Sequence, residues 1–336
     1  MIKILKANKS QTATKAKFKY CHKLIIVVLL VVCIIFISNP ALYSKSCLNA
    51  ISVWSFKVLP VLLPFFIFTK IIVAMIEPRQ TKLDKLFFKI YNTPQTSSTI
   101  FLLSAISGYP MGAKLICDMF DRGIYTQQDA KKMLAFCSIS GPMFMIGTVG
   151  VAIFNSYKAG VIILLSNLIA SLINGLIYRG KRPDLNKREV VLKPNEQTNI
   201  LSDCVYDSLI SILMVGGFMV LAFLLIDVLK NTHILSFVSL PISKLIGVDN
   251  NLVQSVITGG FEITRGIIDL NNCSIALKFK VMFASGLIGF GGISILMQSI
   301  SFLNKLKIKS SYVFLQKLTQ GLLAFVISIP LSLSLI

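Results

Sequence analysis

The chain reads Ser-Gly-Tyr-Pro-Met-Gly-Ala-Lys over residues 107–114, between an apolar run at 100–106 and an amphipathic segment at 115–120. Pro110 removes a backbone donor and the two glycines weaken a helix, so this stretch is not an ordinary membrane-spanning helix. Within a membrane, irregular backbone is tolerated only where protein or a water-filled cavity satisfies its polar groups. The stretch therefore predicts the tip of a re-entrant hairpin beside a pathway; the alternative is a cytoplasmic loop between two helices.

The composition is typical of a polytopic membrane protein. Of the 336 residues, 54% are hydrophobic and 14% are charged, which is more apolar than a soluble domain of this size. The net charge of +20 comes from basic residues in the polar gaps between apolar runs, so we expect a lipid bilayer as the partner and no nucleic acid. His22 and His233 are isolated from other good ligands, and we expect no metal, no cofactor and no His-based catalysis.

Positive charge predicts the topology, because basic residues mark the cytoplasmic side. By this rule the N-terminal arm (1–23), the loop at 77–91 and the linker at 179–199 are cytoplasmic. Basic residues also follow the stretch at 95–120, so a hairpin there leaves on the side where it entered. The predicted fold is all-α, with about seven membrane spans, two re-entrant hairpins and the C-terminus outside. The spans are expected at 24–37, 49–76, 133–154, 159–178, 205–229, 276–303 and 312–336.

A second polar, glycine-interrupted segment lies at 252–270, and it aligns with the first hairpin. When Ser107 is placed on Thr258, Lys114 falls on Arg265. Further on, both halves contain a span that we expect to be broken, at 138–142 in the first half and 285–292 in the second.

Each half thus reads hairpin, broken span, unbroken span. The charge pattern brings the first hairpin in from the cytoplasm and the second from outside, so the halves are inverted. We expect one integral membrane domain, 24–336, with the first repeat at about 95–178 and the second at about 252–336. Inverted repeats with discontinuous helices indicate the architecture of a secondary transporter.

Lys114, Glu262 and Arg265 lie beside the hairpin tips and are the first candidates for a substrate-binding site. A charge at the membrane centre costs about 2.5–3.5 kcal/mol even on insertion scales, so these side chains are not expected to face lipid. The alternative is a structural ion pair of Glu262 with Arg265 or Lys114. Small polar residues could also hydrogen-bond a solute, although packing is the expected role of the serines. The other candidates are Gly108, Tyr109, Ser138, Ser140, Thr258 and Gln298.

Four further charged residues near the spans have ordinary interpretations. Asp203 and Asp207 precede or begin the span at 205–229, where acidic side chains complement the helix dipole. Lys57 and Lys70 are expected to extend toward the two ends of the second span, with solvated ammonium groups.

Several runs of sequence resemble the YlbJ family of sporulation integral membrane proteins, and the resemblance covers essentially the whole chain after the N-terminal arm. The runs are GYPMGAK at 108–114, FCSISGP at 136–142, IGTVG at 146–150, GFEITRG at 260–266 and GFGGIS at 289–294, with Gln298. One departure concerns the residues before Ser140. The family leads us to expect an amide pair there, but Ser138 and Ile139 occupy those positions.

This resemblance implies membership of the nucleoside-recognition, or gate-domain, group, whose arrangement is similar to the core of concentrative nucleoside transporters. It also implies an endospore-forming bacterium, a location in the membrane of the sporulating cell and a role in forming the spore cortex. A similarity of fold supplies no ligand by itself. The solute, the coupling ion and the oligomeric state, including a homo-oligomer, therefore stay open.

Three functions are compatible with these features. The first is a secondary transporter or permease for a small polar solute, with the hairpins forming a site near the membrane midplane. The second is a membrane scaffold that recruits sporulation proteins through its loops. The third is an intramembrane enzyme, which we do not expect, since the sequence contains no H-E-x-x-H or G-x-S-x-G motif.

Overall fold

The structure is a computed structural model that describes residues 26–27, 29–75, 81–94, 96–181 and 199–336. All regular elements in these ranges are helical. The N-terminal arm and most of the linker at 179–199 lie outside the described residues.

The helices follow the same order twice along the chain. Each half contains a long helix, a short helix, a two-helix hairpin, a broken helix and an unbroken helix. The first half comprises α2 (Pro40–Val53), η1 (Trp54–Val58), α3 (Leu59–Met75), α4 (Lys82–Tyr91), α5 (Ser97–Ser107), α6 (Met111–Asp121), α7 (Gln127–Cys137), η2 (Met143–Ile153) and α8 (Tyr157–Ile177). The second half comprises α9 (Ile200–Asn231), α10 (Ile234–Ile246), α11 (Asn250–Phe261), α12 (Ile263–Asn271), α13 (Leu277–Phe290), α14 (Gly292–Leu303), η4 (Asn304–Leu306) and α15 (Ser310–Leu335).

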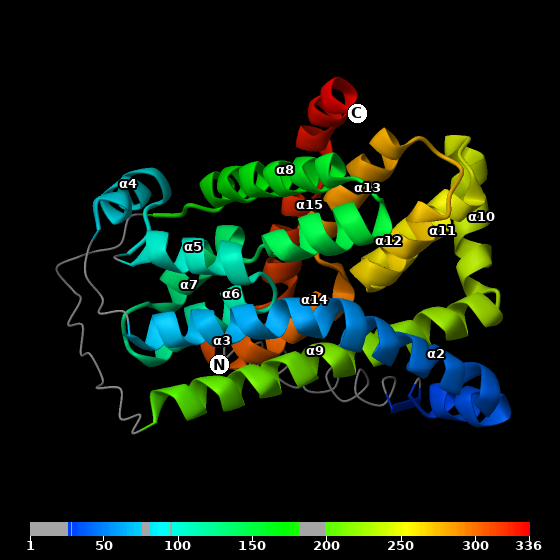
Figure 1. The fold of residues 1–336 in the computed structure, drawn as a ribbon, viewed down its shortest axis with the longest axis horizontal. Coiled ribbons are helices and arrows are strands. Elements are labelled where there is room, and N and C mark those ends of the chain that lie inside the picture. The colour runs from blue at the N-terminus through cyan, green and yellow to red at the C-terminus, as the bar shows by residue number, and fades with distance from the viewer. Residues whose placement is uncertain (1–25, 28, 76–80, 95, 182–198) are drawn as a thin grey trace, which may run out of the picture.

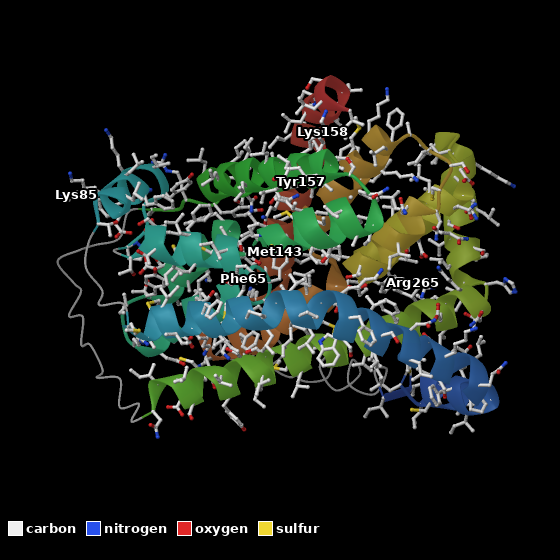
Figure 2. All side chains as sticks on the ribbon, in the orientation of Figure 1. Phe65, Lys85, Met143, Tyr157, Lys158 and Arg265 are labelled. Atoms are coloured by element: carbon white, nitrogen blue, oxygen red, sulfur yellow. The ribbon has the colours of Figure 1, made fainter. Side chains whose placement is uncertain are left out.

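The two halves point in opposite directions. Hairpin 1 (α5 and α6) and α4 lie toward one end of the molecule, while hairpin 2 (α11 and α12) and α10 lie toward the other (Figure 1). Lys85 of α4 and Arg265 of α12 mark these two ends among the side chains (Figure 2). The sequence predicted both hairpins and both helix breaks, but it did not predict α4 or α10, which were assigned to connections.

Among the described residues, five helices are long and apolar enough to cross a membrane. They run over Pro40–Ile72, Tyr157–Ile177, Ile200–Asn231, Leu277–Leu306 and Ser310–Leu335. The chain is therefore a polytopic helical membrane protein, as predicted, although the number of such helices differs from the predicted spans. The span expected at 24–37 falls partly outside the described residues, with an apolar helix at Leu29–Ser38, and the one at 133–154 is divided into α7 and η2.

Two buried apolar clusters divide the broken helices between them. Phe136 of α7 and Leu296 of α14 belong to the first cluster. Met145 of η2 and Ile288 of α13 belong to the second. Each broken helix thus has one half in each cluster, so its irregular, polar segment falls where the helix passes from one cluster to the other.

Glycines allow the hairpins to pack closely. Gly108, at the tip of hairpin 1, has a φ of 78°, and a side chain there would collide with the backbone of Gly141 in the break after α7. In hairpin 2, a Cβ on Gly266 would collide with the Gly259 backbone of the antiparallel helix. The tip of hairpin 1 can therefore meet the break after α7, and the two helices of hairpin 2 can pack closely, only because these positions lack side chains.

Gly266→Ala should consequently destabilise the protein, whereas Gly260→Ala in the same hairpin should not, because a Cβ at Gly260 meets nothing within 4 Å. Overpacking typically costs about 1–3 kcal/mol, while replacing an unobstructed helical glycine by alanine gains about 0.5–1 kcal/mol. Thermal unfolding of the two variants in the same detergent measures the difference. Equal melting temperatures for both would show that the hairpin does not depend on this close approach.

Asp84 joins α4 to the start of hairpin 1. Its carboxylate accepts hydrogen bonds from the Thr81 backbone at 2.9 Å and, through the other oxygen, from the Ser98 backbone at 2.9 Å and the Ser98 hydroxyl at 2.7 Å. Thr81 in turn caps α4 by accepting from the Asp84 backbone. Burial alone would raise the pKa of the Asp84 carboxyl, but the hydrogen bonds from Thr81 and Ser98 outweigh burial and lower it.

Because its pKa is lowered on folding, the Asp84 carboxylate stabilises the folded protein above the unfolded pKa of about 3.9, and this stabilisation is lost as pH falls through the folded pKa. Asp84→Asn should therefore cost about 1–2 kcal/mol at pH 7, and the difference from wild type should shrink toward pH 3. Melting temperatures across this range test the expectation, with Asp203→Asn in the exposed first turn of α9 as control. A pH-independent difference would contradict it.

Candidate functional site

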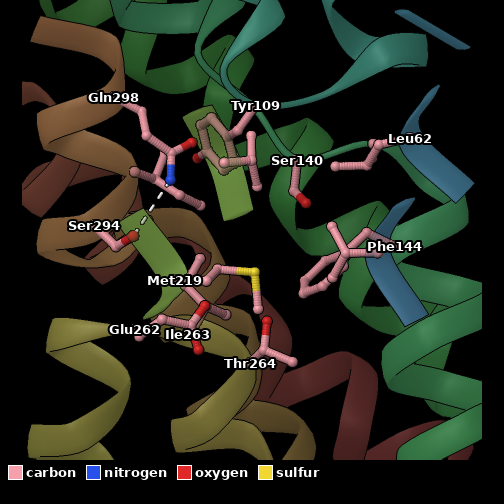
Figure 3. A pocket seen from close by; sticks show the side chains of 14 residues that line it. Leu62, Tyr109, Ser140, Phe144, Met219, Glu262, Ile263, Thr264, Ser294 and Gln298 are labelled. Atoms are coloured by element: carbon pink, nitrogen blue, oxygen red, sulfur yellow. Dashed lines mark hydrogen bonds between the residues drawn. The ribbon is translucent and has the colours of Figure 1, made fainter. Parts of the chain in front are cut away.

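A small cavity lies where the hairpin tips and the helix breaks of both halves converge. Its volume is about 50 Å³. Hairpin 1 contributes Tyr109, and the break before η2 contributes Ser140 and Gly141. The second half contributes Glu262 and Thr264 from hairpin 2, on the opposite side of the cavity from Tyr109 and Ser140 (Figure 3). Ile263 of α12 also lines the cavity. The remaining wall comes from α14, η2, η1, α3 and α9, with Ser294, Ile295, Gln298, Phe144, Val58, Leu62, Val215 and Met219.

Glu262 is the acidic residue of this cavity, and it is only 4% exposed. It lies between α11 and α12 and caps α12, with its carboxylate accepting a hydrogen bond from the Arg265 backbone at 2.7 Å. Thr264 also hydrogen-bonds to it. The start of a helix carries unpaired N–H groups and a positive dipole, which together favour a carboxylate. Hairpin 2 thus presents a buried negative charge held by backbone rather than by a cationic side chain.

The other polar groups could bind a small solute through hydrogen bonds. Gln298 donates to the Ser294 hydroxyl at 3.3 Å along α14, and the Ser140 hydroxyl lies across the cavity near Phe144 (Figure 3). A drug-sized ligand needs a pocket of about 300 Å³ or more, whereas a water needs about 10–15 Å³ of comparable space. In this conformation the cavity can hold waters or a small ion, and a larger solute requires the hairpins to separate.

Lys114 does not line the cavity but belongs to an ionic cluster that joins hairpin 1 to two long helices. The Lys70 ammonium of α3 lies 2.6 Å from an Asp207 oxygen of α9 and 3.7 Å from Asp118 of α6. Lys114 of α6 lies 3.8 Å from the same Asp207 oxygen and donates to the Ser211 hydroxyl at 2.9 Å. Asp207 is therefore a shared partner of two lysines rather than only a complement of the helix dipole, and Lys70 is paired rather than simply solvated.

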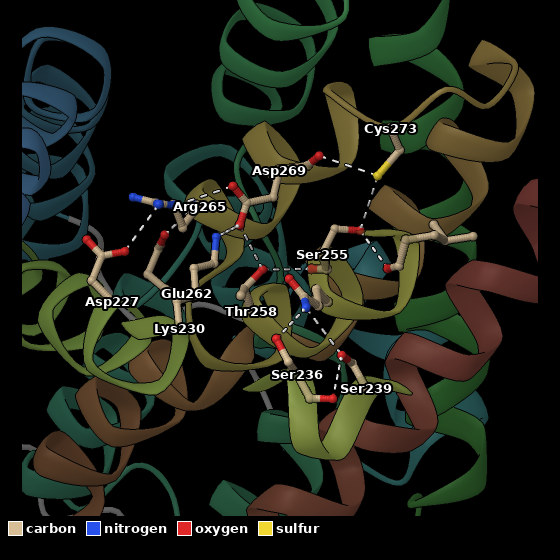
Figure 4. Close-up of polar contacts among 12 residues, drawn as sticks. Asp227, Lys230, Ser236, Ser239, Ser255, Thr258, Glu262, Arg265, Asp269 and Cys273 are labelled. Carbon is tan, nitrogen blue, oxygen red and sulfur yellow. Dashed lines mark hydrogen bonds and ion pairs between the residues drawn. The ribbon is translucent and has the colours of Figure 1, made fainter. Parts of the chain in front are cut away.

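Arg265 belongs to an equivalent cluster on hairpin 2, also outside the cavity lining. Its guanidinium lies 3.2 Å from Asp227 of α9 and 3.4 Å from Asp269 of α12 (Figure 4). Lys230 of α9 lies 2.8 Å from Asp269. The Thr258 hydroxyl of α11 also donates to Asp269 at 3.2 Å, so it connects the two helices of hairpin 2.

The two clusters correspond under the internal repeat. In each hairpin the second helix carries a basic residue and, four positions later, an aspartate: Lys114 with Asp118, and Arg265 with Asp269. Both pairs lie against α9, the first near its start and the second near its end. Among the described residues Glu262 forms no salt bridge with Arg265 or Lys114, the example of a structural ion pair given as the alternative to a binding site, because both cations pair with aspartates.

The structure therefore separates the predicted site residues into two groups. Four of them line the cavity: Tyr109, Ser140, Glu262 and Gln298. The others hold the surrounding framework: Lys114, Arg265, Thr258, Gly108 and Ser138. Thr264, Ser294 and Met219 were not predicted, although Thr264 is inside the run at 260–266 that carries the resemblance.

A curated protein of Bacillus subtilis (strain 168), described as sporulation integral membrane protein YlbJ, is 26% identical over 316 residues, covering 86% of this chain and 78% of that protein. The chain is thus similar to a YlbJ protein over most of the length of both chains. This similarity confirms the predicted resemblance. The description of the relative as an integral membrane protein agrees with the helical, multi-pass fold of this chain. No protein-family model matches the chain, and no solved structure matches it significantly.

Asp227→Asn should destabilise the fold by about 1–3 kcal/mol, because it removes a partner of the partly buried Arg265. The matched control is Asp121→Asn, which removes the partner of Lys305 in a pair whose side chains are 71% and 45% exposed, against 21% and 19% for Arg265 and Asp227. An exposed pair is worth about 0–1 kcal/mol. Thermal unfolding of both variants measures the contrast, and an equal effect would mean that the cluster does not hold hairpin 2.

Proposed function

We propose that this protein is a secondary transporter or permease for a small polar solute, with the cavity around Glu262 as its binding site. The observation that carries the proposal is the convergence of both hairpin tips and both helix breaks on one buried carboxylate. Broken helices leave backbone donors and acceptors free, and such groups near the centre of a membrane domain are the usual means of binding polar solutes in transporters.

In the proposed membrane arrangement, hairpins 1 and 2 are re-entrant from opposite faces. Asp207 and Asp227 are 20 positions apart on the continuous helix α9. At 1.5 Å per residue this is about 30 Å, the thickness of the hydrocarbon core. The two ionic clusters would then lie near the two membrane surfaces, with the cavity between them. The basic loops put hairpin 1 and the N-terminus on the cytoplasmic side and the C-terminus outside.

The proposed mechanism uses the two hairpins in turn. The 50 Å³ cavity is closed to a solute of ordinary metabolite size, so hairpin 1 or hairpin 2 must move to admit one. Each hairpin is held to α9 by its own ionic cluster, so the hairpin on one face can be released while the other stays bound. Release of one cluster while the other holds would expose Glu262 to one face at a time, which is the requirement of alternating access.

We further propose that this non-enzymatic transport serves spore formation, in particular that of the cortex. The support is the name of the Bacillus subtilis relative, which describes a sporulation protein. The domain 24–336 would act as one membrane unit, with its arm and the linker at 179–199 in the cytoplasm. Nucleosides are one solute class that the family resemblance brings forward for testing.

The deciding experiment is a thermal-shift screen of the purified protein in detergent against nucleosides, nucleobases, amino acids and small organic anions and cations. A solute bound to the folded state stabilises it by about 2.7 kcal/mol at one hundred times its dissociation constant. We expect at least one class to raise the melting temperature of wild type but not of Glu262→Gln. Asp121→Asn, on the exposed pair with Lys305, serves as the control variant and should respond like wild type.

Stabilisation of Glu262→Gln and wild type to the same extent would place the bound solute elsewhere. If Glu262→Gln unfolds in detergent, Gln298→Ala is used in its place. Gln298 lines the same cavity as Glu262 but caps no helix. The absence of stabilisation by every class would count against a solute-binding function and favour the scaffold hypothesis.

A further inference from the structure

Lys317 of α15 is a buried lysine that belongs neither to the cavity lining nor to an ionic cluster. It is 2% exposed, and no carboxylate of the described residues forms an ion pair with it. Its ammonium instead donates to the Ser138 carbonyl at 2.8 Å, the Gln320 side-chain oxygen at 2.8 Å and the Tyr109 hydroxyl. The side-chain nitrogen of Lys317 is therefore surrounded by three oxygens. They come from Tyr109 at the tip of hairpin 1, from Ser138 in the break after α7, and from Gln320 of α15.

The donor directions of the contacts around Lys317 fit a charged ammonium. The Tyr109 hydroxyl has a single proton, which points to the carbonyls of Ile288 at 3.3 Å and Gly289 at 3.4 Å. Its oxygen must then accept from Lys317. Lys317 thus donates three hydrogen bonds, and a neutral amine has only two N–H groups whereas an ammonium has three.

Helix dipoles supply the negative potential that a carboxylate would otherwise provide. Ser138 follows the last residue of α7, and Ile288 and Gly289 lie in the last turn of α13. The C-terminal end of a helix is equivalent to about half a negative charge. The ring of Tyr109 lies 4.5 Å from the ammonium and adds an attractive face. The position is therefore a site for a small cation at the meeting point of two half-helices.

A neutral amide makes a related contact elsewhere in the protein. In α8, the Asn167 amide donates to the Ser285 carbonyl at 3.3 Å. Ser285 aligns with Ser138 when the second half is shortened by four residues between the hairpin and the broken span, although Ser285 lies within α13 and Ser138 follows the end of α7. Asn167 of the first half thus contacts a carbonyl of α13 through a neutral amide. Lys317 of the second half contacts the carbonyl after α7 through its side-chain nitrogen, which also bonds to the tip of hairpin 1 through Tyr109.

We infer that the ammonium group of Lys317 occupies a site built for a monovalent cation. This covalently attached cation holds hairpin 1 closed against the ends of α7 and α13. Its role in gating rests on the proposed transport function, whereas the site itself does not. Because the cation is part of the chain, closure of hairpin 1 needs no free Na⁺ or K⁺. Removal of the ammonium leaves the oxygens in place and creates a site that a free ammonium or methylammonium ion can occupy.

The test is chemical rescue of Lys317→Ala, followed by thermal unfolding without any solute. In tetramethylammonium chloride, which offers no N–H donor, this variant should melt at least about 5 °C below wild type. Exchange for ammonium or methylammonium chloride at constant ionic strength should restore the melting temperature in a concentration-dependent manner. Wild type should melt at the same temperature in all these salts, including those of Na⁺ and K⁺.

Lys317→Met is the matched control, because its side chain fills the space of the removed carbons and should prevent rescue. Rescue of both variants alike would reveal a general salt effect and overturn the inference, as would the absence of rescue in Lys317→Ala. If Lys317→Ala does not fold, Lys317→Gln decides, since it offers the neutral amide used by α8: a wild-type melting temperature would show that no cation is needed. All readouts are stabilities, so a failure of solute transport leaves them interpretable.

Discussion

The structure depends on one constraint: two helices are interrupted in the interior, and the backbone groups freed there have to be satisfied inside the protein. Hairpin tips meet this requirement by bringing side chains and glycines to the interruptions. Gly108 allows the first tip to touch the break after α7, and Glu262 caps the first turn of α12 beside the other break. The polar centre is therefore a consequence of the chain interruptions and of the groups that compensate for them.

Charged side chains are stabilised in two different ways, by ion pairs in the two clusters and by helix ends at the buried residues Glu262 and Lys317. The clusters around Asp207 and Asp227 are partly solvated and pair cations with carboxylates, which suits contacts that form and break. Glu262 and Lys317 are almost fully buried, and each is held by helix ends rather than by an opposite charge. The second arrangement keeps a charge within the protein without linking it to a partner that would have to move with it.

Local sequence signals were sufficient to locate the two hairpins and the two helix interruptions. Pro110 and the glycines around it marked the hairpin, and the basic gaps gave the opposite orientation of the halves. The partners of Lys114 and Arg265 were not predictable in this way, since Asp207 is far from Lys114 in sequence and Asp227 is far from Arg265. Lys317 was missed because a lysine near the start of a final helix has the pattern of an ordinary surface residue; only the fold buries it. The helix α4 was missed although Thr81 and Asp84 form a recognisable cap.

The division of each broken helix between two apolar clusters has a mechanical consequence. α7 and α14 contribute to one cluster, and η2 and α13 contribute to the other. Each cluster can keep its interdigitated packing as a rigid body while the few residues around Ser138 and Gly291 act as hinges. Relative rotation of the two bodies would then disturb a small number of backbone contacts and little apolar burial. In the proposed transport function, movement of the hairpins would then occur at the boundary between the two clusters, where Glu262 and Lys317 are buried.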